Sequence, residues 1–364
     1  MAPGRYTTKW LDFEKESATE DTETTEKKTR IESKEDKQAR SEVPNTAPFF
    51  FKSLCPLWQK DVGQRKFVRG WNHSMQKLDI KRVQPLIRMA MEEDLGRGDM
   101  TTNLLFQDGT RAKAMIVSRE EIVMAGLPVV KEILRQYDKR LKMTAYFEDG
   151  QRAHVSNKLA LIEGPLRSML SVERVLLNFL QRLSGIATTT NRYVRAIKGT
   201  KAKIYDTRKT LPGWRLLEKY AVRCGGGYNH RMGLYDGILV KDNHLAELGG
   251  DFPEQLRRLV AKARKVKGLQ FVAVEVDHVD DQLNHVLTIP GIDIVLLDNM
   301  GQWQLKHAVE MRDAMCGKNK GPLLEASGNI TLNNVSEIAQ CGVDRIAVGA
   351  ITHSAAAVDI GLDR

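Results

Sequence analysis

The segment AKIYDTRKTLPGWRLLEKYAVRCGGGYNHRMGLYDGILVKDNH, residues 202–244, joins two short apolar runs through a helix-like stretch. The first run, 202–205, ends at Asp206, and the second run, 237–240, ends at Lys241. Apolar runs that alternate with helical patterns are typical of strand–helix–strand units with parallel strands. The segment therefore predicts an α/β fold in which charged side chains follow the carboxyl ends of the strands.

The same pattern recurs through the rest of the chain. Six runs share it, at 202–205, 237–240, 271–274, 293–297, 322–324 and 345–348. Alternating strands and helices predict a parallel sheet that is covered on both faces. Six such units with polar strand ends favour a closed α/β barrel whose site lies at the rim. An open doubly wound sheet is the alternative, although no G-x-G-x-x-G fingerprint follows any of the runs.

Cations and glycines are concentrated in the opening segment. Three consecutive glycines, 225–227, suit a backbone that takes unusual angles or lies close to a ligand. The charged or protonatable side chains around them are Arg208, Lys209, Arg215, Lys219, Arg223, His230, Arg231, Lys241 and His244. Because the arginine fork fits carboxylates and phosphates, the segment predicts a receptor for a small molecule with several negative charges.

Two acids and two small-residue turns complete the predicted rim. Glu275 and Asp298 follow successive strands, and such a pair can hold Mg²⁺ or do acid–base work on a sugar. Ser327-Gly328 and Gly349 come late in the barrel, where loop amides commonly bind phosphate. Together with the cations, these residues predict a phosphorylated sugar, Mg²⁺ and a second anionic ligand.

The overall composition restricts the class of protein. With 364 residues the chain can hold two domains, and 42% apolar residues can supply a buried core. The net charge of +10 raises the question of nucleic acid. However, the cations do not form one basic run with interleaved aromatic residues, which make up only 6% of the chain. We therefore assign the charge to a polyanion site and a basic surface, and expect no nucleic acid as partner.

Cysteine usage and hydropathy bear on the compartment. Cys55, Cys224, Cys316 and Cys341 show neither a C-x-x-C pair nor zinc-ligand spacing, so reduced thiols are expected. Cys224 adjoins the glycines, but no partnered base marks it as a nucleophile. No apolar run approaches the length of a membrane span, so no membrane partner is expected. These features favour a cytoplasmic protein.

Residues 1–75 differ from the rest and are predicted to form a largely disordered extension. Residues 1–45 are rich in Glu, Asp, Lys and Thr and poor in large apolar side chains. Their acids argue against an organellar transit peptide, and they lack the apolar core of a secretory signal. Residues 46–75 contain clustered Phe and Trp, which suit a docking segment, a partner-binding motif or a poorly ordered extension equally well.

A small α+β domain with a mostly antiparallel sheet is predicted next. Helical spacing covers about 79–93 and 128–135, and β-like runs occupy 114–117, 143–147 and 159–162. A further helix is expected to begin at the N-cap Ser171 and to end at Ser184-Gly185. Arg174 lies in its first turn, where periodicity alone favours a surface cation.

Several segments occur in a specific order that points to one family. They are EEDLGRGDMTT (92–102), SVERVLLNFLQRLSGIATTT (171–190), DTRKTLPGWRLLEKYAV (206–222), GGGYNHRMGLYDGILVKDNH (225–244), VEVD (274–277), LLDN (296–299), LEASGNIT (324–331) and AVGAITHS (347–354). Each is weak alone. Together they resemble the quinolinate phosphoribosyltransferases, also called carboxylating nicotinate-nucleotide pyrophosphorylases, and the resemblance covers about residues 76–364.

The resemblance implies a two-domain subunit of α/β class. Residues 76–176, with the tail 354–364, would form an N-terminal α+β sandwich, and residues 177–353 an incomplete α/β barrel with the catalytic site. It also implies a homodimer, or a higher even-numbered oligomer, with shared active sites. In such a pair the arginine that matches Arg174 reaches into the site of the other subunit.

The resemblance further implies the reaction and the roles of the site residues. Quinolinate and phosphoribosyl pyrophosphate would give nicotinate mononucleotide, pyrophosphate and CO₂ in NAD biosynthesis, with Mg²⁺ as cofactor. The residues that would hold quinolinate are Arg208, Lys209, His230, Arg231, Lys241 and, from the other subunit, Arg174. Catalysis would fall to Lys209, Glu275 and Asp298, with the two acids at the ribose and Mg²⁺. The 5′-phosphate would lie near Ser327, Gly328 and Gly349.

Two positions depart from the family pattern, and two other functions are possible. Asn329 stands where a second glycine is usual, and Trp214 replaces a small aliphatic residue. Since Asn tolerates left-handed backbone angles, we expect the phosphate turn to survive. The alternatives are a molybdenum-transport-associated paralogue with another acceptor and a non-catalytic scaffold in which segment 49–71 recruits partners. The complete set of cations and acids favours the enzyme.

Overall fold

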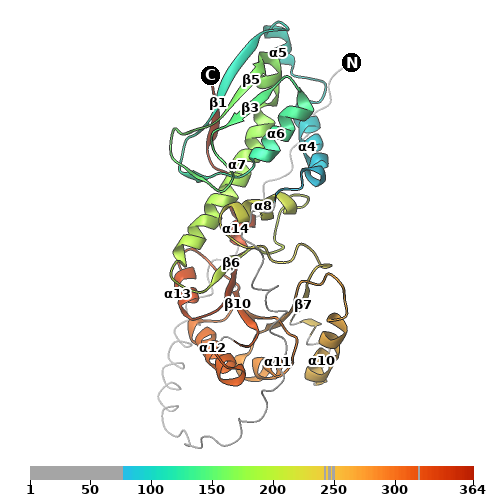
Figure 1. Ribbon diagram of the computed structural model, residues 1–364, viewed down its shortest axis with the longest axis vertical. Coiled ribbons are helices and arrows are strands. Elements are labelled where there is room, and N and C mark those ends of the chain that lie inside the picture. Colours follow the sequence, from blue (N-terminus) through green and yellow to red (C-terminus); the bar gives the residue numbers. More distant parts are fainter. Residues whose placement is uncertain (1–76, 242, 245–246, 248–250, 319) are drawn as a thin grey trace, which may run out of the picture. The chain divides into compact units, whose positions relative to one another are not determined.

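The computed structural model describes residues 77–241, 243–244, 247, 251–318 and 320–364 (Figure 1). The predicted extension, residues 1–75, lies outside the described residues. The main sheets in the described part are a four-stranded antiparallel sheet and a six-stranded parallel sheet. This mixed architecture confirms the predicted fold class.

The antiparallel sheet has the strand order β12-β1-β5-β3. Its strands are β1 (Arg111–Ser118), β3 (Lys142–Ala145), β5 (Lys158–Pro165) and β12 (Ile360–Asp363), accompanied by a ribbon of β2 (Ile122–Val123) and β4 (Arg152–Ala153). In the second half of β1, fully buried residues alternate with half-buried ones, as expected for a sheet with one packed face. The last strand, β12, pairs with β1, so the end of the chain joins this sheet.

Short helices accompany the antiparallel sheet. They are α4 (Ile80–Leu95), α5 (Met100–Leu105) and α6 (Leu127–Tyr137), which confirms the helices predicted at 79–93 and 128–135. Two aspartates order their ends. The Asp99 side chain accepts the backbone N–H of Thr102 and caps α5, while Asp149 accepts the N–H groups of Gly126 and Leu127 where α6 begins.

One long helix, α7 (Leu166–Ala196), replaces the shorter helix predicted from Ser171 to Gly185. Ser171 is not an N-cap, because it lies inside α7 and its hydroxyl donates to Asp99 at 3.0 Å. Gly185 does not end the helix either. A Cβ on Gly185 would lie 2.0 Å from the carbonyl oxygen of Ala356, so glycine serves close packing here. The domain division near residue 176 stays a prediction, and α7 runs continuously through that point.

The parallel sheet contains all six predicted strands. They are β6 (Lys203–Tyr205), β7 (Ile238–Val240), β8 (Val272–Val276), β9 (Ile294–Asp298), β10 (Leu323–Ser327) and β11 (Arg345–Ala347), in the order β6-β11-β10-β9-β8-β7. The first strand therefore lies beside the last, which excludes a doubly wound sheet. Within the described residues no strand ladder joins β6 to β7. Instead Tyr228 forms a bridge with Tyr205 of β6. The prediction of a closed barrel from the repeats is therefore wrong, and the barrel is incomplete.

Helices follow the strands and cover them. They are α8 (Arg215–Cys224), α10 (Phe252–Ala263), the π-helical turn η3 (Val279–Leu283), α11 (Asn284–Leu287), α12 (Gln302–Cys316), α13 (Val335–Gln340) and α14 (Ala350–His353). Figure 1 shows α10, α11, α12 and α13 around the parallel strands. Every residue of β8 is buried, as expected for a strand covered on both faces.

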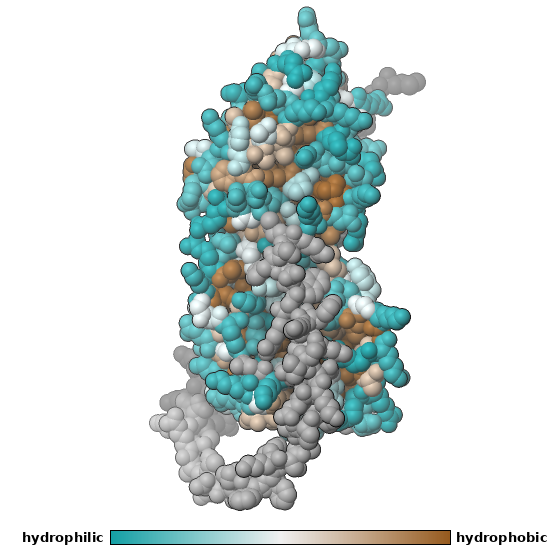
Figure 2. All heavy atoms as spheres, viewed as in Figure 1, coloured by the Kyte–Doolittle hydropathy of each residue, from teal (hydrophilic) through white to brown (hydrophobic). Residues whose placement is uncertain are grey.

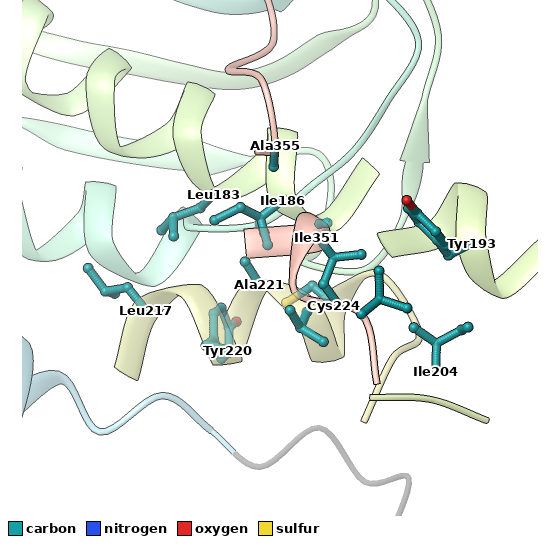
Figure 3. Close-up of a cluster of buried hydrophobic side chains, with 14 of the residues drawn as sticks. Leu183, Ile186, Tyr193, Ile204, Leu217, Tyr220, Ala221, Cys224, Ile351 and Ala355 are labelled. Carbon is teal, nitrogen blue, oxygen red and sulfur yellow. The ribbon is translucent and has the colours of Figure 1, made fainter. Parts of the chain in front are cut away.

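An apolar cluster joins α7 to elements of the barrel. Figure 3 shows Leu183 and Ile186 of α7 gathered with Leu217 of α8 and with Ile351 of α14. All four side chains are at most 1% exposed, so burial anchors both barrel helices on α7.

The surface is polar on the face shown in Figure 2, where separate hydrophobic patches interrupt a mainly hydrophilic exterior. Among the large apolar side chains that remain exposed are Met100, Leu104 and Leu105 of α5. A search of the described helices finds none that is long and apolar enough to cross a membrane.

Candidate active site

A cavity of about 750 Å³ lies at the carboxyl ends of the parallel strands. Ten predicted site residues line it: Arg208, Lys209, His230, Arg231, Lys241, Glu275, Asp298, Ser327, Gly328 and Gly349. They are distant in sequence but meet in space because parallel strands end at one rim. Arg174 is the exception, since it is exposed on α7 and does not line this cavity.

Two arginines that line the cavity, Arg208 and Arg231, lie close enough for their charges to interact. Arg231 is only 7% exposed, and its Nη1 donates to the carbonyl oxygen of Gly237 at 2.8 Å. Burial lowers the pKa of Arg231, and the nearby charge of Arg208 lowers it further. An anionic ligand would relieve both effects, because it would balance two like charges held in a poorly solvated site.

Arg215 holds the loops that carry these cations but does not line the cavity itself. It donates through Nε to the hydroxyl of Thr210 at 3.0 Å, through Nη1 to the carbonyl of Met232 at 3.0 Å, and through Nη2 to the carbonyl of Arg208 at 3.3 Å. The guanidinium therefore ties the loop after β6 to the loop before β7.

Lys219 is also structural. It is 1% exposed on α8, and its ammonium group donates to Asp206 and to the carbonyl oxygen of His230. Asp206, which is fully buried, also accepts the backbone N–H of His230 at 2.8 Å and the Asn229 amide at 2.6 Å. This network fixes the backbone at His230 and uses Lys219 as an internal counter-ion.

The three glycines support helix packing and do not line the cavity. A Cβ on Gly225 would lie 2.4 Å from the carbonyl of Ala187, and one on Gly227 would lie 2.7 Å from the Thr190 side chain. Of the three, Gly226 alone has a left-handed φ, of 87°. The interpretation of a backbone close to a ligand is therefore wrong, whereas unusual angles are needed at one position.

The two predicted acids lie on neighbouring strands, Glu275 on β8 and Asp298 on β9, and each has a defined partner. Both oxygens of Glu275 are 3.2 Å from the ammonium nitrogen of Lys241. Asp298 accepts the hydroxyl of Ser327 at 2.6 Å and the Asn299 amide at 2.7 Å. Each oxygen of Asp298 accepts one of these bonds and keeps capacity for a further ligand.

A third acid, Glu325, also lines the cavity, although the sequence pattern predicted no role for it. It is fully buried on β10, and one oxygen accepts Nε of its cross-strand neighbour Arg345. Arg345 in turn stacks over the Tyr205 ring at 3.6 Å. Burial alone would raise the pKa of Glu325, but Arg345 and then His230 outweigh it and lower the pKa to about 2.

The Glu325 carboxylate also orients His230. Nε2 of His230 lies 3.3 Å from Oε1 of Glu325, and Nδ1 accepts the backbone N–H of Arg231 at 2.9 Å. Both ring nitrogens of His230 therefore have a partner, Nε2 in the Glu325 carboxylate and Nδ1 in the backbone. These contacts fix the ring of His230 where it lines the cavity.

The predicted phosphate turn contains two left-handed residues in succession. Gly328 has φ 88° and Asn329 has φ 49°. A Cβ on Gly328 would lie 2.1 Å from Oδ1 of Asn299, which excludes any side chain there. Asn329 tolerates its angle and donates to Asn299 at 3.1 Å, while its carbonyl accepts the Asn334 amide. The turn therefore forms despite the departure from a second glycine.

Gly349 and His353 form the neighbouring part of the wall. A Cβ on Gly349 would lie 3.0 Å from Nε2 of His353 and 3.3 Å from Cδ of Lys209. His353 lines the cavity but was not selected from the sequence, although it lies in the segment 347–354. Its spacing from Gly349 was the available signal, since four residues make one helical turn.

The fold and cavity define a class of protein: an incomplete α/β barrel with a polyanion pocket at its strand ends, joined to a small antiparallel domain. A family model described as quinolinate phosphoribosyl transferase, N-terminal domain, matches residues 99–184. The model of the C-terminal domain of the same family matches residues 186–363. The chain belongs to the quinolinate phosphoribosyltransferase family.

Individual relatives are similar over most of their length. The chain is 39% identical to a probable nicotinate-nucleotide pyrophosphorylase (carboxylating) of Bacillus subtilis over 290 residues, which covers 79% of this chain and 94% of that protein. For the Mycobacterium leprae enzyme the identity is 43% over 283 residues, covering 76% and 95%. The solved structure of the nicotinate-nucleotide pyrophosphorylase from Francisella tularensis superposes with a TM-score of 0.72 at 39% identity, covering 79% and 98%.

Proposed function

We propose that this protein transfers the phosphoribosyl group of phosphoribosyl pyrophosphate to quinolinate and releases CO₂, giving nicotinate mononucleotide and pyrophosphate for NAD biosynthesis. The observation that carries the proposal is the cavity itself, because ten residues selected from the sequence line it. Family membership independently supports the same activity.

The acceptor fits the cationic side of the cavity. Quinolinate carries two adjacent carboxylates, and Arg208, Lys209, Arg231 and Lys241 provide cations from several loops. Receptors from separate loops fix the orientation of the pyridine ring, which converts the attack of its nitrogen into a step between aligned partners. His230 lines the same cavity.

The chemistry requires no covalent enzyme intermediate. The pyridine nitrogen bonds to the sugar C1 as the bond from C1 to pyrophosphate breaks, and that electron pair leaves with pyrophosphate. Glu275 and Asp298 stabilise the positive charge that develops on the sugar. The ring nitrogen is then cationic, so the C2–carboxylate bond can break with its electron pair on C2. CO₂ departs and C2 takes up a proton.

Mg²⁺ fits the acidic side of the cavity. Asp298 and Glu275 stand on adjacent strands, and Asp298 retains acceptor capacity beside its bonds to Ser327 and Asn299. Mg²⁺ typically takes one or two carboxylates and completes its shell with water and substrate phosphates. When bound, it would neutralise charge on the leaving pyrophosphate.

We infer that the functional unit is a homodimer or a higher even-numbered oligomer, and that Arg174 completes the site of the other subunit. Arg174 is exposed on α7, one turn beyond Ser171. The hydroxyl of Ser171 bonds to Asp99, the N-cap of α5, and so holds the start of α5 against α7. The exposed apolar residues Met100 and Leu104 of α5 supply surface that pairing would bury. A cytoplasmic location is part of this proposal, because the cysteine spacing suits a reducing compartment.

The test is release of labelled CO₂ from quinolinate labelled in its C2 carboxylate. Release should require the protein, phosphoribosyl pyrophosphate and Mg²⁺, and a parallel reaction with nicotinate should form no nucleotide. Lys209→Met should abolish release, whereas Lys198→Met, at an exposed lysine on the surface, should leave it unchanged. No release from folded wild-type protein would overturn the proposal.

Binding of phosphoribosyl pyrophosphate, measured beside CO₂ release, separates the alternatives. A paralogue with another acceptor would bind phosphoribosyl pyrophosphate but release no CO₂ from quinolinate. A non-catalytic scaffold would bind neither substrate, and a saturable protein partner of segment 49–71 would then be the expected finding.

A further inference from the structure

Arg182 of α7 gathers three acceptors from two separate segments, one in α8 and two in residues 352–355. Its Nη1 donates to the carbonyl of Ala355 at 2.6 Å, and its Nη2 donates to the carbonyl of Thr352 at 2.7 Å and to Oε1 of Glu218 at 2.7 Å. The Arg182 side chain is 19% exposed and Glu218 is fully buried. These are charge-assisted bonds in a place with little water to replace them.

Glu218 extends the contact to the loop after β6. Its second oxygen, Oε2, accepts the backbone N–H of Leu211 at 3.2 Å. Leu211 closes the segment 207–211, which carries the cavity residues Arg208 and Lys209. We call residues 207–211 the cation loop.

The other end of the contact is the segment 349–355. We call it the phosphate loop, and it is separate from the phosphate turn at Gly328 and Asn329. It contains Gly349 and His353, which line the cavity. Thr352 joins the two loops directly, because its hydroxyl lies 2.7 Å from the carbonyl oxygen of Lys209. Arg182, Glu218 and Thr352 therefore form one continuous set of hydrogen bonds from the cation loop to the phosphate loop.

Apolar packing does not by itself set the direction of these loops. Figure 3 shows Leu183 of α7, Leu217 of α8, and Ile351 and Ala355 of the phosphate loop in one apolar cluster. Such contacts are non-directional, whereas a guanidinium fork and a carboxylate fix the backbone groups that they bond. A buried ion pair adds little stability relative to apolar residues, so a positioning role explains its presence better than a stabilising role.

We propose that Arg182 and Glu218 are positioning residues that align the cation loop with the phosphate loop, so that the subsites for quinolinate and the sugar phosphate are built together. The proposal rests on the proposed function for the identity of the two ligands. The alignment of the loops is independent of it. Loss of the pair should weaken the binding of both substrates, whereas loss of a residue that lines one subsite should weaken the binding of one substrate.

The experiment compares Arg182→Met and Glu218→Gln with Arg312→Met in the full chain. Arg312 is a matched control, because it is 1% exposed on α12, pairs with Asp313 and Asp344, and does not line the cavity. Amide hydrogen exchange of peptides covering the two loops is measured without substrate. KM for each substrate and kcat are measured in parallel.

Arg182→Met should speed exchange in both loops by about tenfold and raise both KM values by about tenfold, with a smaller change in kcat. Glu218→Gln should show the same pattern in milder form, because it retains an acceptor for Leu211. Arg312→Met should leave exchange in both loops and both KM values within about twofold. If Arg182→Met does not fold, Glu218→Gln decides the outcome.

Two results would overturn the proposal. One is unchanged exchange in the loops of folded Arg182→Met and Glu218→Gln proteins. The other is the same loop exchange and KM changes in Arg312→Met, which would show a general effect of losing a buried arginine. If wild-type protein proves inactive on quinolinate, the proposed function fails, while the exchange measurement still decides whether the two residues align the loops.

Discussion

The substitution Glu325→Gln removes one buried charge and almost no volume. In the folded chain the pKa of Glu325 is lowered from its ordinary 4.5 to about 2, since the charges of Arg345 and His230 outweigh the cost of burial. At about 1.4 kcal/mol for each pH unit, this difference corresponds to roughly 3 kcal/mol of folding free energy. Removing one partner of a buried ion pair typically costs about 3–5 kcal/mol, which agrees.

The loss should depend on pH in a defined direction. Because the folded pKa lies below the unfolded one, the contribution of Glu325 is complete above about 4.5 and disappears as the pH falls toward about 2. Glu325→Gln should therefore be less stable than the wild type by roughly 3 kcal/mol at neutral pH, and the gap should narrow in acid. Urea unfolding followed by circular dichroism at several pH values measures this gap.

An exposed acid provides the control. Glu254 pairs with Arg257 and Arg258 on the surface of α10 and is 45% exposed. Glu254→Gln should change stability by less than about 0.5 kcal/mol at any pH. A Glu325→Gln loss below about 1 kcal/mol at neutral pH, or a loss that does not shrink in acid, would refute the assignment of Glu325 as an ionised partner of Arg345.

Three further outcomes are expected. Gly328→Ala should lower kcat/KM for phosphoribosyl pyrophosphate by at least about tenfold, because the new Cβ would lie 2.1 Å from Asn299 at a left-handed φ; retained affinity in steady-state assays would contradict this. Arg174→Ala and Lys209→Ala should each be inactive, and mixing the two proteins should partly restore turnover. No recovery after subunit exchange would show that sites are not shared between subunits. Deleting residues 1–70 should leave kcat within about twofold, and a large loss would assign the extension to the fold or site.

The strands were predictable because their signal is local. A strand buried on both faces appears as a short apolar run, and a polar residue at its carboxyl end marks the rim. All six runs became strands, and the cavity is lined by polar residues at or just after their ends, among them Lys241, Glu275, Asp298 and Ser327. Closure of the barrel was not predictable, since pairing of β6 with β7 depends on atoms outside both runs, and Tyr228 occupies that edge of β6.

Helix ends were less predictable for a related reason. Ser171 and Gly185 carry the local chemistry of helix caps, yet both lie inside α7. Ser171 donates to Asp99, and Gly185 packs closely against the backbone of Ala356. Neither partner is near in sequence. The triple glycine shows the same effect, because its packing against α7 uses residues of a separate element.

The roles of the charged residues were likewise predictable from the sequence in part and decided by the tertiary structure in part. Residue type and order were sufficient for the α/β class, the family and the ten lining residues, because these depend on short-range pattern and on the common rim of parallel strands. The tertiary structure alone decided that Lys219 is the buried counter-ion of Asp206, and that Glu325 is held by Arg345. A charge becomes a ligand contact or an internal partner through desolvation and distance, and both are set by neighbours from other strands and helices.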